Sequence, residues 1–178
     1  MEEAFSTHFL ELEKTEGPVN YADEETRQKV RSCAWNTVKA YMTSGEVASQ
    51  MPLGVEVGLS ATIPGLPVPV RGVIDLVQHD LTAVDYKSTS AKPDNGYAAF
   101  DHELQLVTYQ MMIEEATGDT PPSLDLIYLV KTKSPQVIRV KTPPANEQRK
   151  HRVADLYKIA YDGITTERFH PQPGMQCS

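Results

Sequence analysis

Residues 71–90, RGVIDLVQHDLTAVDYKSTS, contain two apolar runs joined by a short polar turn, a pattern typical of a β-hairpin. Each run nevertheless contains an aspartate, Asp75 in the first and Asp85 in the second. If the pairing is symmetric about residue 80, these two aspartates lie opposite each other. Like charges that face each other across a sheet repel, so the sequence predicts a compensating group, for which a divalent cation is the obvious candidate.

Two further residues are predicted to join this patch. Side chains two residues apart in a strand share a face, so Lys87 projects together with Asp85. The PGLP turn at 64–67 folds the preceding strand back and places Glu56 beside residue 75 or 76. Three carboxylates and one lysine then converge, although a slip of one residue in register would break the arrangement. The alternative is that the aspartates are exposed acids on a solvated sheet face, with the lysine as their ion-pair partner.

The rest of the chain alternates between helical and strand patterns, which predicts a mixed sheet with helices against its faces. Helices are expected in the N-terminal stretch that Gly17 and Pro18 end, and over about residues 22–44, 101–116 and 145–163. Strands are expected over about residues 53–63, 68–77, 82–88, 123–132 and 136–142. Gly45 and Gly118 are the expected ends of the second and third helices.

The composition narrows the class of protein. At 178 residues the chain has a normal size for one domain with its own core. Its net charge of −7 argues against a protein that coats nucleic acid with a broad basic surface, but it is compatible with an enzyme whose carboxylates bind metal ions. No apolar run is long enough to cross a membrane, and no signal-peptide pattern is present. Two cysteines, Cys33 and Cys177, are too few for a disulfide framework and fit a reducing, cytoplasmic environment.

Three segments, RGVIDLV, AVDYKS and ELQLVTYQ, occur in an order that resembles the motifs of the PD-(D/E)xK nuclease superfamily, and specifically its RecB-like exonuclease branch. That branch has a glycine-x-isoleucine-aspartate strand, an aspartate-x-lysine strand and a helix with glutamine-x-x-x-tyrosine. The matching residues here are Gly72–Asp75, Asp85–Lys87, and Gln105 with Tyr109; Glu56 falls where the family has an acid before the first motif. The resemblance implies an α/β, restriction-endonuclease-like fold with a mixed central β-sheet flanked by α-helices.

By that resemblance the protein is a metal-dependent deoxyribonuclease, an exonuclease that hydrolyses the phosphodiester bonds of DNA. Asp75 and Asp85 would bind Mg²⁺ or Mn²⁺ together with the main-chain carbonyl of Tyr86, and Glu56 is a further candidate ligand. Lys87 would orient or deprotonate the attacking water. Phosphodiester hydrolysis needs a Lewis acid on the phosphoryl oxygen and an activated water, and a bound metal ion supplies both.

Gln105 and Tyr109 lie four residues apart on the predicted helix and therefore share a face. The resemblance implies that this face contacts the DNA backbone or supports Lys87. The alternative is an amphipathic helix in which Tyr109 packs and Gln105 caps the packed edge. For the whole chain, the alternative to an enzyme is a non-catalytic DNA-binding or scaffold module with a nuclease fold in a larger complex, and the acidic composition keeps this alternative open.

The resemblance also implies one nuclease domain over residues 1–178, acting in DNA repair, recombination or phage-like DNA processing. A helicase or a larger recombination complex is its expected partner, and no membrane is involved. The parts of the domain are a helical N-terminal segment, the catalytic core, a C-terminal helix and a tail, over residues 1–50, 53–142, 145–163 and 164–178. The oligomeric state is left open.

Two features of the branch are incomplete in this chain. Many RecB-like nucleases carry a metal-binding histidine in an N-terminal helix after a glycine, and His8 lacks that glycine. The iron–sulfur members bind their cluster with four cysteines, whereas this chain has only Cys33 and Cys177. We therefore expect no iron–sulfur cluster in this chain, and a longer parent that continues past Ser178 would have to supply the missing cysteines.

The second half of the chain is locally basic, through Lys131, Lys133, Arg139, Lys141, Arg149, Lys150 and Arg152. Such residues can form a track that binds phosphate groups. The alternative is a solvated charged face.

Overall fold

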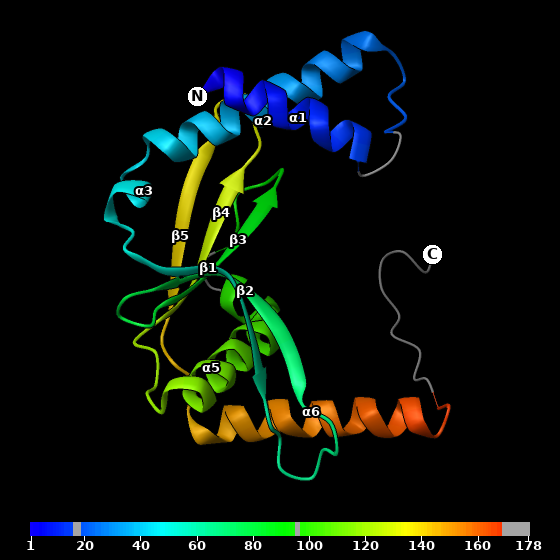
Figure 1. Ribbon diagram of the computed structural model, residues 1–178, viewed down its shortest axis with the longest axis vertical. Helices are drawn as coiled ribbons and strands as arrows, with labels where there is room; N and C mark the ends of the chain where they lie inside the picture. Colours follow the sequence, from blue (N-terminus) through cyan, green and yellow to red (C-terminus); the bar gives the residue numbers. More distant parts are fainter. Residues whose placement is uncertain (16–18, 95–96, 169–178) are drawn as a thin grey trace. The chain divides into compact units, whose positions relative to one another are not determined.

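The computed structural model describes residues 1–15, 19–94 and 97–168, and within these ranges the chain forms six helices and five strands (Figure 1). The helices are α1 Glu2–Thr15, α2 Glu24–Thr43, α3 Gly45–Ser49, α4 Ala98–Asp101, α5 Glu103–Thr117 and α6 Glu147–Thr165. The strands are β1 Pro52–Ala61, β2 Val70–Gln78, β3 Ala83–Thr89, β4 Leu124–Val130 and β5 Gln136–Thr142. The strands form one sheet in the order β1-β2-β3-β4-β5.

The sheet is mixed. The pairs β1–β2 and β2–β3 are antiparallel. Between β3 and β4, the N–H of Ala83 donates to the carbonyl of Ser123 at 3.2 Å, and the N–H of Lys131 donates to the carbonyl of Thr89 at 2.7 Å. Residue numbers rise together along these two strands, so they run parallel, and α5 lies in the crossover connection that such a pair requires. The predicted fold class, a mixed sheet flanked by helices, is confirmed.

The chain divides into two compact units. The first comprises Met1–Met51, Tyr86–Ala98 and Leu126–Val140. Its helices α1 and α2 lie against each other (Figure 1). Phe5 packs on Trp35 with ring centroids 5.3 Å apart, and Arg27 pairs with Glu13 at 2.7 Å. These contacts hold the N-terminal helix on the second one, although no residue of α1 is itself buried.

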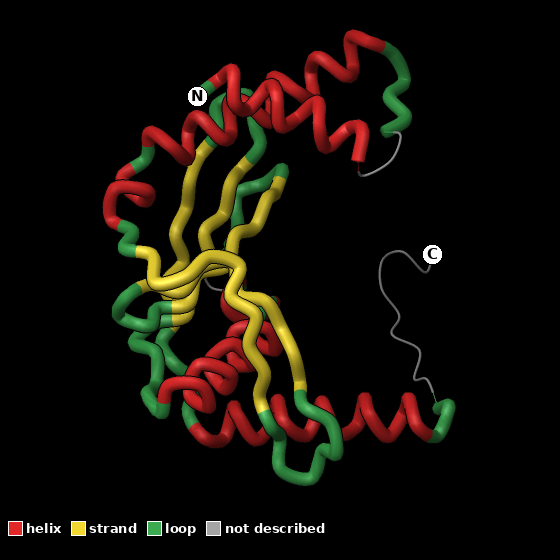
Figure 2. Tube along the Cα trace, viewed as in Figure 1, coloured by secondary structure: helices red, strands yellow, loops and turns green. Residues whose placement is uncertain are grey.

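The second unit comprises Pro52–Asp85, Ala99–Asp125 and Lys141–Ser178, and its described part contains the β1–β2 hairpin, α5 and α6 (Figure 2). One buried cluster joins Val107 of α5 to Ala145 and Val153, with Met111 and Tyr157 packed against it. Burying an apolar side chain of valine size or larger contributes about 1.5–3 kcal/mol. The contact between α5 and α6 is therefore a principal part of this unit's core.

The ends of the helices test two of the glycine predictions. Gly118 ends α5 as predicted, in the left-handed conformation with a φ of 81°. The prediction that Gly45 ends α2 is wrong, because the extended Ser44 does so. The Ser44 hydroxyl donates to the carbonyl of Tyr41 at 2.6 Å, which satisfies a terminal carbonyl without a left-handed residue, and Gly45 instead begins the short helix α3.

Replacing Gln110 by leucine is expected to lower the free energy of unfolding by about 2–4 kcal/mol, because it leaves two buried main-chain groups unsatisfied. Gln110 is 1% exposed; its Oε1 accepts from the N–H of Ala145 at 2.7 Å, and its Nε2 donates to the carbonyl of the same residue at 3.1 Å. Urea denaturation measures the change. The exposed Gln148, replaced by leucine, is the matched control and should leave stability unchanged; equal effects of both changes would contradict the prediction.

Candidate active site

The β2–β3 hairpin sets the relative positions of the two predicted aspartates. Its paired residues are Leu76 with Val84 and Val77 with Ala83. Continuing this register by one residue places Asp75 opposite Asp85, at the end of the paired segment. The turn over 78–82, where the N–H of Gln78 donates to the carbonyl of Thr82 at 3.0 Å, determines that register. The predicted pairing symmetric about residue 80 is confirmed.

Asp85 carries a buried carboxylate that two residues of α5 contact. The residue is 3% exposed. Gln105 Nε2 donates to Asp85 Oδ1 at 2.8 Å, and the Tyr109 hydroxyl lies 3.3 Å from the same oxygen. Gln105 Nε2 also donates to the Tyr109 hydroxyl at 2.7 Å. The two residues therefore share a helix face, as predicted, and that face is turned toward Asp85.

The Tyr109 hydroxyl also links α5 to β2, because it donates to the main-chain carbonyl of Val73 at 3.0 Å. Burial raises the pKa of Tyr109 above its ordinary value, and the negative charges of Asp85 and Asp75 raise it further. The hydrogen bond from Gln105 lowers this pKa but does not cancel the increase. The phenol therefore keeps its proton at neutral pH and remains a donor within the site.

The hydrogen bonds from α5 offset part of the repulsion between the facing aspartates. Gln105 Nε2 donates to the Asp85 carboxylate, and the Tyr109 hydroxyl lies beside the same oxygen, so polar groups of α5 surround the buried acid. Asp75 is half-buried and close enough for its charge to act on Tyr109. The alternative of a solvated sheet face does not apply to Asp85, because its side chain is buried.

Glu56, the third predicted acid, lies on β1. The neighbouring residue pairs are Val55 with Leu76 and Val57 with Ile74. Glu56 therefore falls opposite Asp75, as predicted from the PGLP turn. Its φ of 51° lies in the left-handed region, which is uncommon for residues other than glycine and occurs often at functional sites. Its side chain is exposed, and its role as a metal ligand stays a prediction.

Tyr86 and Lys87 follow Asp85 on β3 and belong to the first unit. The Tyr86 hydroxyl is hydrogen-bonded to that of Tyr41 at 2.7 Å, and Gln50 Nε2 donates to the Tyr86 hydroxyl at 2.9 Å. These contacts hold β3 at the residue whose main-chain carbonyl is a predicted ligand. Lys87 is half-buried, and the alternation of the strand puts it on the same strand face as Asp85.

The donor set fits a hard divalent cation. By the predicted assignment, Asp75 and Asp85 would supply two carboxylates, and the carbonyl of Tyr86 would supply a further oxygen. Within residues 1–15, 19–94 and 97–168, no three His, Cys, Asp or Glu side chains are grouped so that they could hold a metal ion. Mg²⁺ does not need such a group, since it commonly binds through one or two carboxylates and keeps several of its waters.

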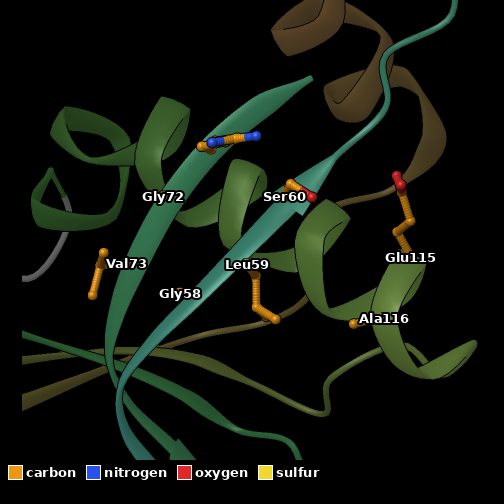
Figure 3. Close-up of a pocket in the computed structure, with 8 residues that line it drawn as sticks. Gly58, Leu59, Ser60, Gly72, Val73, Glu115 and Ala116 are labelled. Atoms are coloured by element: carbon orange, nitrogen blue, oxygen red, sulfur yellow. The ribbon is translucent and has the colours of Figure 1, made fainter. Parts of the chain in front are cut away.

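A hollow of about 750 Å³ lies beside the β1–β2 hairpin, and none of the predicted site residues lines it. Figure 3 shows Leu59 and Ser60 of β1 on one side of it and Glu115 of α5 on another. Gly72 of β2 also lines it and lies close to α5, where an added Cβ would come within 3.1 Å of Met112 Cε. The glycine of the first motif therefore allows β2 to approach α5, from which the donors to Asp85 project.

Sequence reasoning did not single out two buried acids, Glu103 and Asp125. Glu103 accepts from Arg149 Nε at 2.7 Å and pairs with Arg152 at 3.0 Å. The sequence did contain a pattern that could have indicated this ion pair. Arg149 and Arg152 lie three residues apart on one helix and therefore present neighbouring positive charges to an acid. Asp125 is 1% exposed and accepts from the hydroxyl of Ser123. Glu103 is thus an ion-pair partner of α6, and we assign neither acid to the site.

The two cysteines give no information on a metal cluster. Cys33 lies on α2 as a free, half-buried thiol. Cys177 lies outside the described residues.

No helix of the described part of the chain is long and apolar enough to span a membrane.

Comparisons with known proteins place this chain in a family. The model of the PD-(D/E)XK nuclease superfamily matches residues 1–178, so the chain belongs to that superfamily. A search of curated proteins found no matching sequence. Among solved structures, a protein from Eubacterium rectale described as "Putative exonuclease" is similar, with a TM-score of 0.67 at 10% identity over 99% of this chain and 70% of that chain. This likeness shows a nuclease-type fold in which the mixed five-stranded sheet has flanking helices.

A second solved structure, of the protein SSO0001, has a TM-score of 0.44 at 13% identity, over 86% of this chain and 70% of that chain. Nucleases of the PD-(D/E)XK superfamily typically use a divalent metal ion and act on DNA, and the oxygen ligands present here are of the type that such an ion prefers.

Proposed function

We propose that this protein is a Mg²⁺- or Mn²⁺-dependent deoxyribonuclease of the RecB-like type that removes nucleotides from DNA ends. The observation that carries the proposal is the buried Asp85 carboxylate, which Gln105 and Tyr109 contact one residue beyond the paired segment of the β2–β3 hairpin. Membership of the nuclease superfamily and the motif order of the RecB-like branch support it. The whole described chain then acts as one nuclease domain in the cytoplasm, in DNA repair, recombination or phage-like processing, with a helicase or recombination complex as its partner.

Each residue of the proposed site has its own role in the hydrolysis. Asp75, Asp85 and the Tyr86 carbonyl would hold the cation, which when bound supplies a Lewis acid for the phosphoryl oxygen. Gln105 and Tyr109 hold the Asp85 carboxylate in position, because each contacts the same carboxylate oxygen. Lys87 orients the attacking water by hydrogen bonding or, as an unprotonated amine, accepts its proton.

Incubation with end-labelled linear DNA and with closed circular DNA, in Mg²⁺, Mn²⁺ or EDTA, tests the proposal. We expect metal-dependent release of label from linear DNA and no cleavage of the circle. Cleavage of both substrates would show an endonuclease and contradict the exonuclease assignment. DNA binding without cleavage in either metal would instead support the non-catalytic module.

Replacing Glu56 by glutamine is expected to reduce cleavage more at low metal concentration than at saturating metal. Glutamine keeps the size of the side chain but removes the charge that would attract the cation, directly or through water. Titration of activity against Mn²⁺ measures the effect as a rise in the half-saturating concentration. Glu46→Gln serves as the control. It removes the same charge from a glutamate that pairs with Arg139 and is not a predicted site residue. A loss of the same size at every metal concentration would assign Glu56 to folding or positioning instead.

A further inference from the structure

A groove of about 510 Å³ lies within the first unit, between α2 and the turn that joins β4 to β5. Lys29 contributes to it from α2, and Lys131 and Lys133 contribute from the turn. Neutral groups that can form hydrogen bonds, among them those of Gln28 and Asn36, line the same groove. None of its lining residues is aromatic.

The groove has an excess of positive charge. Its one acidic residue, Glu25, pairs with Lys29 at 2.6 Å. Lys131 and Lys133 are exposed, and in the part of the chain that the structure describes neither has a carboxylate partner. Other basic residues in the second half of the chain do form ion pairs. Acids of α5 pair with Arg149, Lys150 and Arg152, and Glu46 pairs with Arg139. Folding therefore leaves Lys131 and Lys133 available to bind an anion in the groove, whereas the exposed Lys141 does not line it.

The position of the groove relates it to the proposed catalytic lysine. The N–H of Lys131 donates to the carbonyl of Thr89 at 2.7 Å, so the turn is joined to the end of β3. Thr89 lies two residues after Lys87 on that strand, which corresponds to a separation of about 7 Å along β3. The turn that contributes Lys131 and Lys133 to the groove is therefore hydrogen-bonded to the strand that carries Lys87.

We infer that this groove binds the sugar–phosphate backbone of the DNA strand on which the enzyme acts. The inference rests on the proposed nuclease function. Lysine binds phosphate as a compact point charge, and amide and hydroxyl side chains donate to phosphate oxygens. Because the groove offers no aromatic surface on which bases could stack, its contacts are independent of base sequence. The groove would hold the DNA while it is cleaved and would not take part in the chemistry.

The first test compares two double variants that lose the same charge. Lys131→Gln/Lys133→Gln removes the two unpaired lysines of the groove, whereas Lys14→Gln/Lys158→Gln removes two lysines that do not line it. Binding of a labelled single-stranded 20-nucleotide oligonucleotide is measured by fluorescence anisotropy in EDTA over a series of salt concentrations. We expect the groove variant to bind roughly 10-fold more weakly near 0.1 M salt and its salt slope to fall by about 1.4, since each phosphate contact to a single strand contributes about 0.7.

The control variant should keep the affinity and the slope of the wild-type protein. Equal weakening in both variants would show that only net charge matters and would overturn the inference, as would the absence of any change in the groove variant.

Cys33 lines the groove and allows a test that does not depend on activity. In a Cys177→Ser background, the rate of Cys33 alkylation by iodoacetamide is measured in EDTA with and without the oligonucleotide. We expect bound DNA to slow alkylation severalfold in the Lys14→Gln/Lys158→Gln variant but not in the groove variant at the same DNA concentration. An unchanged rate at saturating DNA would overturn the inference.

The two proposals fail in different ways. If the protein cleaves DNA while Cys33 stays unprotected, the groove assignment is wrong and the nuclease assignment stands. If DNA protects Cys33 but no metal supports cleavage, the groove assignment stands and the nuclease assignment is wrong.

Discussion

Replacing Asp85 or Asp75 by asparagine is expected to reduce DNA cleavage by about 1000-fold or more and to weaken Mn²⁺ binding. Each change removes one anionic oxygen ligand of the proposed cation. A bound metal ion stabilises the charge of the transition state by several kcal/mol, and each 1.36 kcal/mol corresponds to a tenfold change in rate. Asparagine keeps the shape of the side chain, and in place of Asp85 its carbonyl oxygen can still accept from Gln105.

Asp119→Asn provides the control for this prediction, because it removes the same charge from an exposed residue outside the site. Isothermal titration with Mn²⁺ measures metal affinity, cleavage of end-labelled linear DNA measures activity, and thermal denaturation verifies folding. An Asp85→Asn protein that binds Mn²⁺ as tightly as the wild type would rule out Asp85 as a ligand. Loss of activity together with loss of the folded state would assign the residue a structural role.

Replacing Lys87 by alanine is expected to lower the rate of cleavage by about 100- to 10,000-fold, the range typical of a general acid or base, while Mn²⁺ affinity stays unchanged. The ammonium group is not a metal ligand, so its loss affects the water and not the cation. Lysine and arginine differ in hydration and geometry, so Lys87→Arg should not restore the full rate.

The comparison of metal affinity with rate separates the lysine from the aspartates. Lys92→Ala removes an exposed lysine just after β3 and should leave both quantities unchanged. If Lys87→Ala weakens Mn²⁺ binding as much as Asp85→Asn does, the lysine acts by holding the carboxylates. If it leaves cleavage intact, the assignment of Lys87 to the chemistry is wrong.

The sequence by itself determined the hairpin, its register and the family. The short turn at His79 and Asp80 selects the register, and a slip of one residue would move every side chain to the other face of the sheet. The same reasoning from the PGLP turn placed Glu56 beside residue 75 or 76, and the register puts it opposite Asp75. The helix spacing put Gln105 and Tyr109 on one face, and the motifs indicated the superfamily to which the chain belongs. All of these are local properties, because they depend on residues within one or two adjacent elements.

Only the tertiary structure decided what those residues contact. Gln105 and Tyr109 contact the Asp85 carboxylate because α5 packs close to β2. The helical period places the two residues on one face of the helix, but it does not indicate which element that face contacts. The tertiary structure likewise decides which basic residues form ion pairs. Glu103 and Glu114 pair with basic residues of α6, whereas Lys131 and Lys133 of the β4–β5 turn line one groove with Lys29 of α2. These partners lie far apart in the sequence, and the packing of whole elements brings them together, which no local pattern of residues specifies.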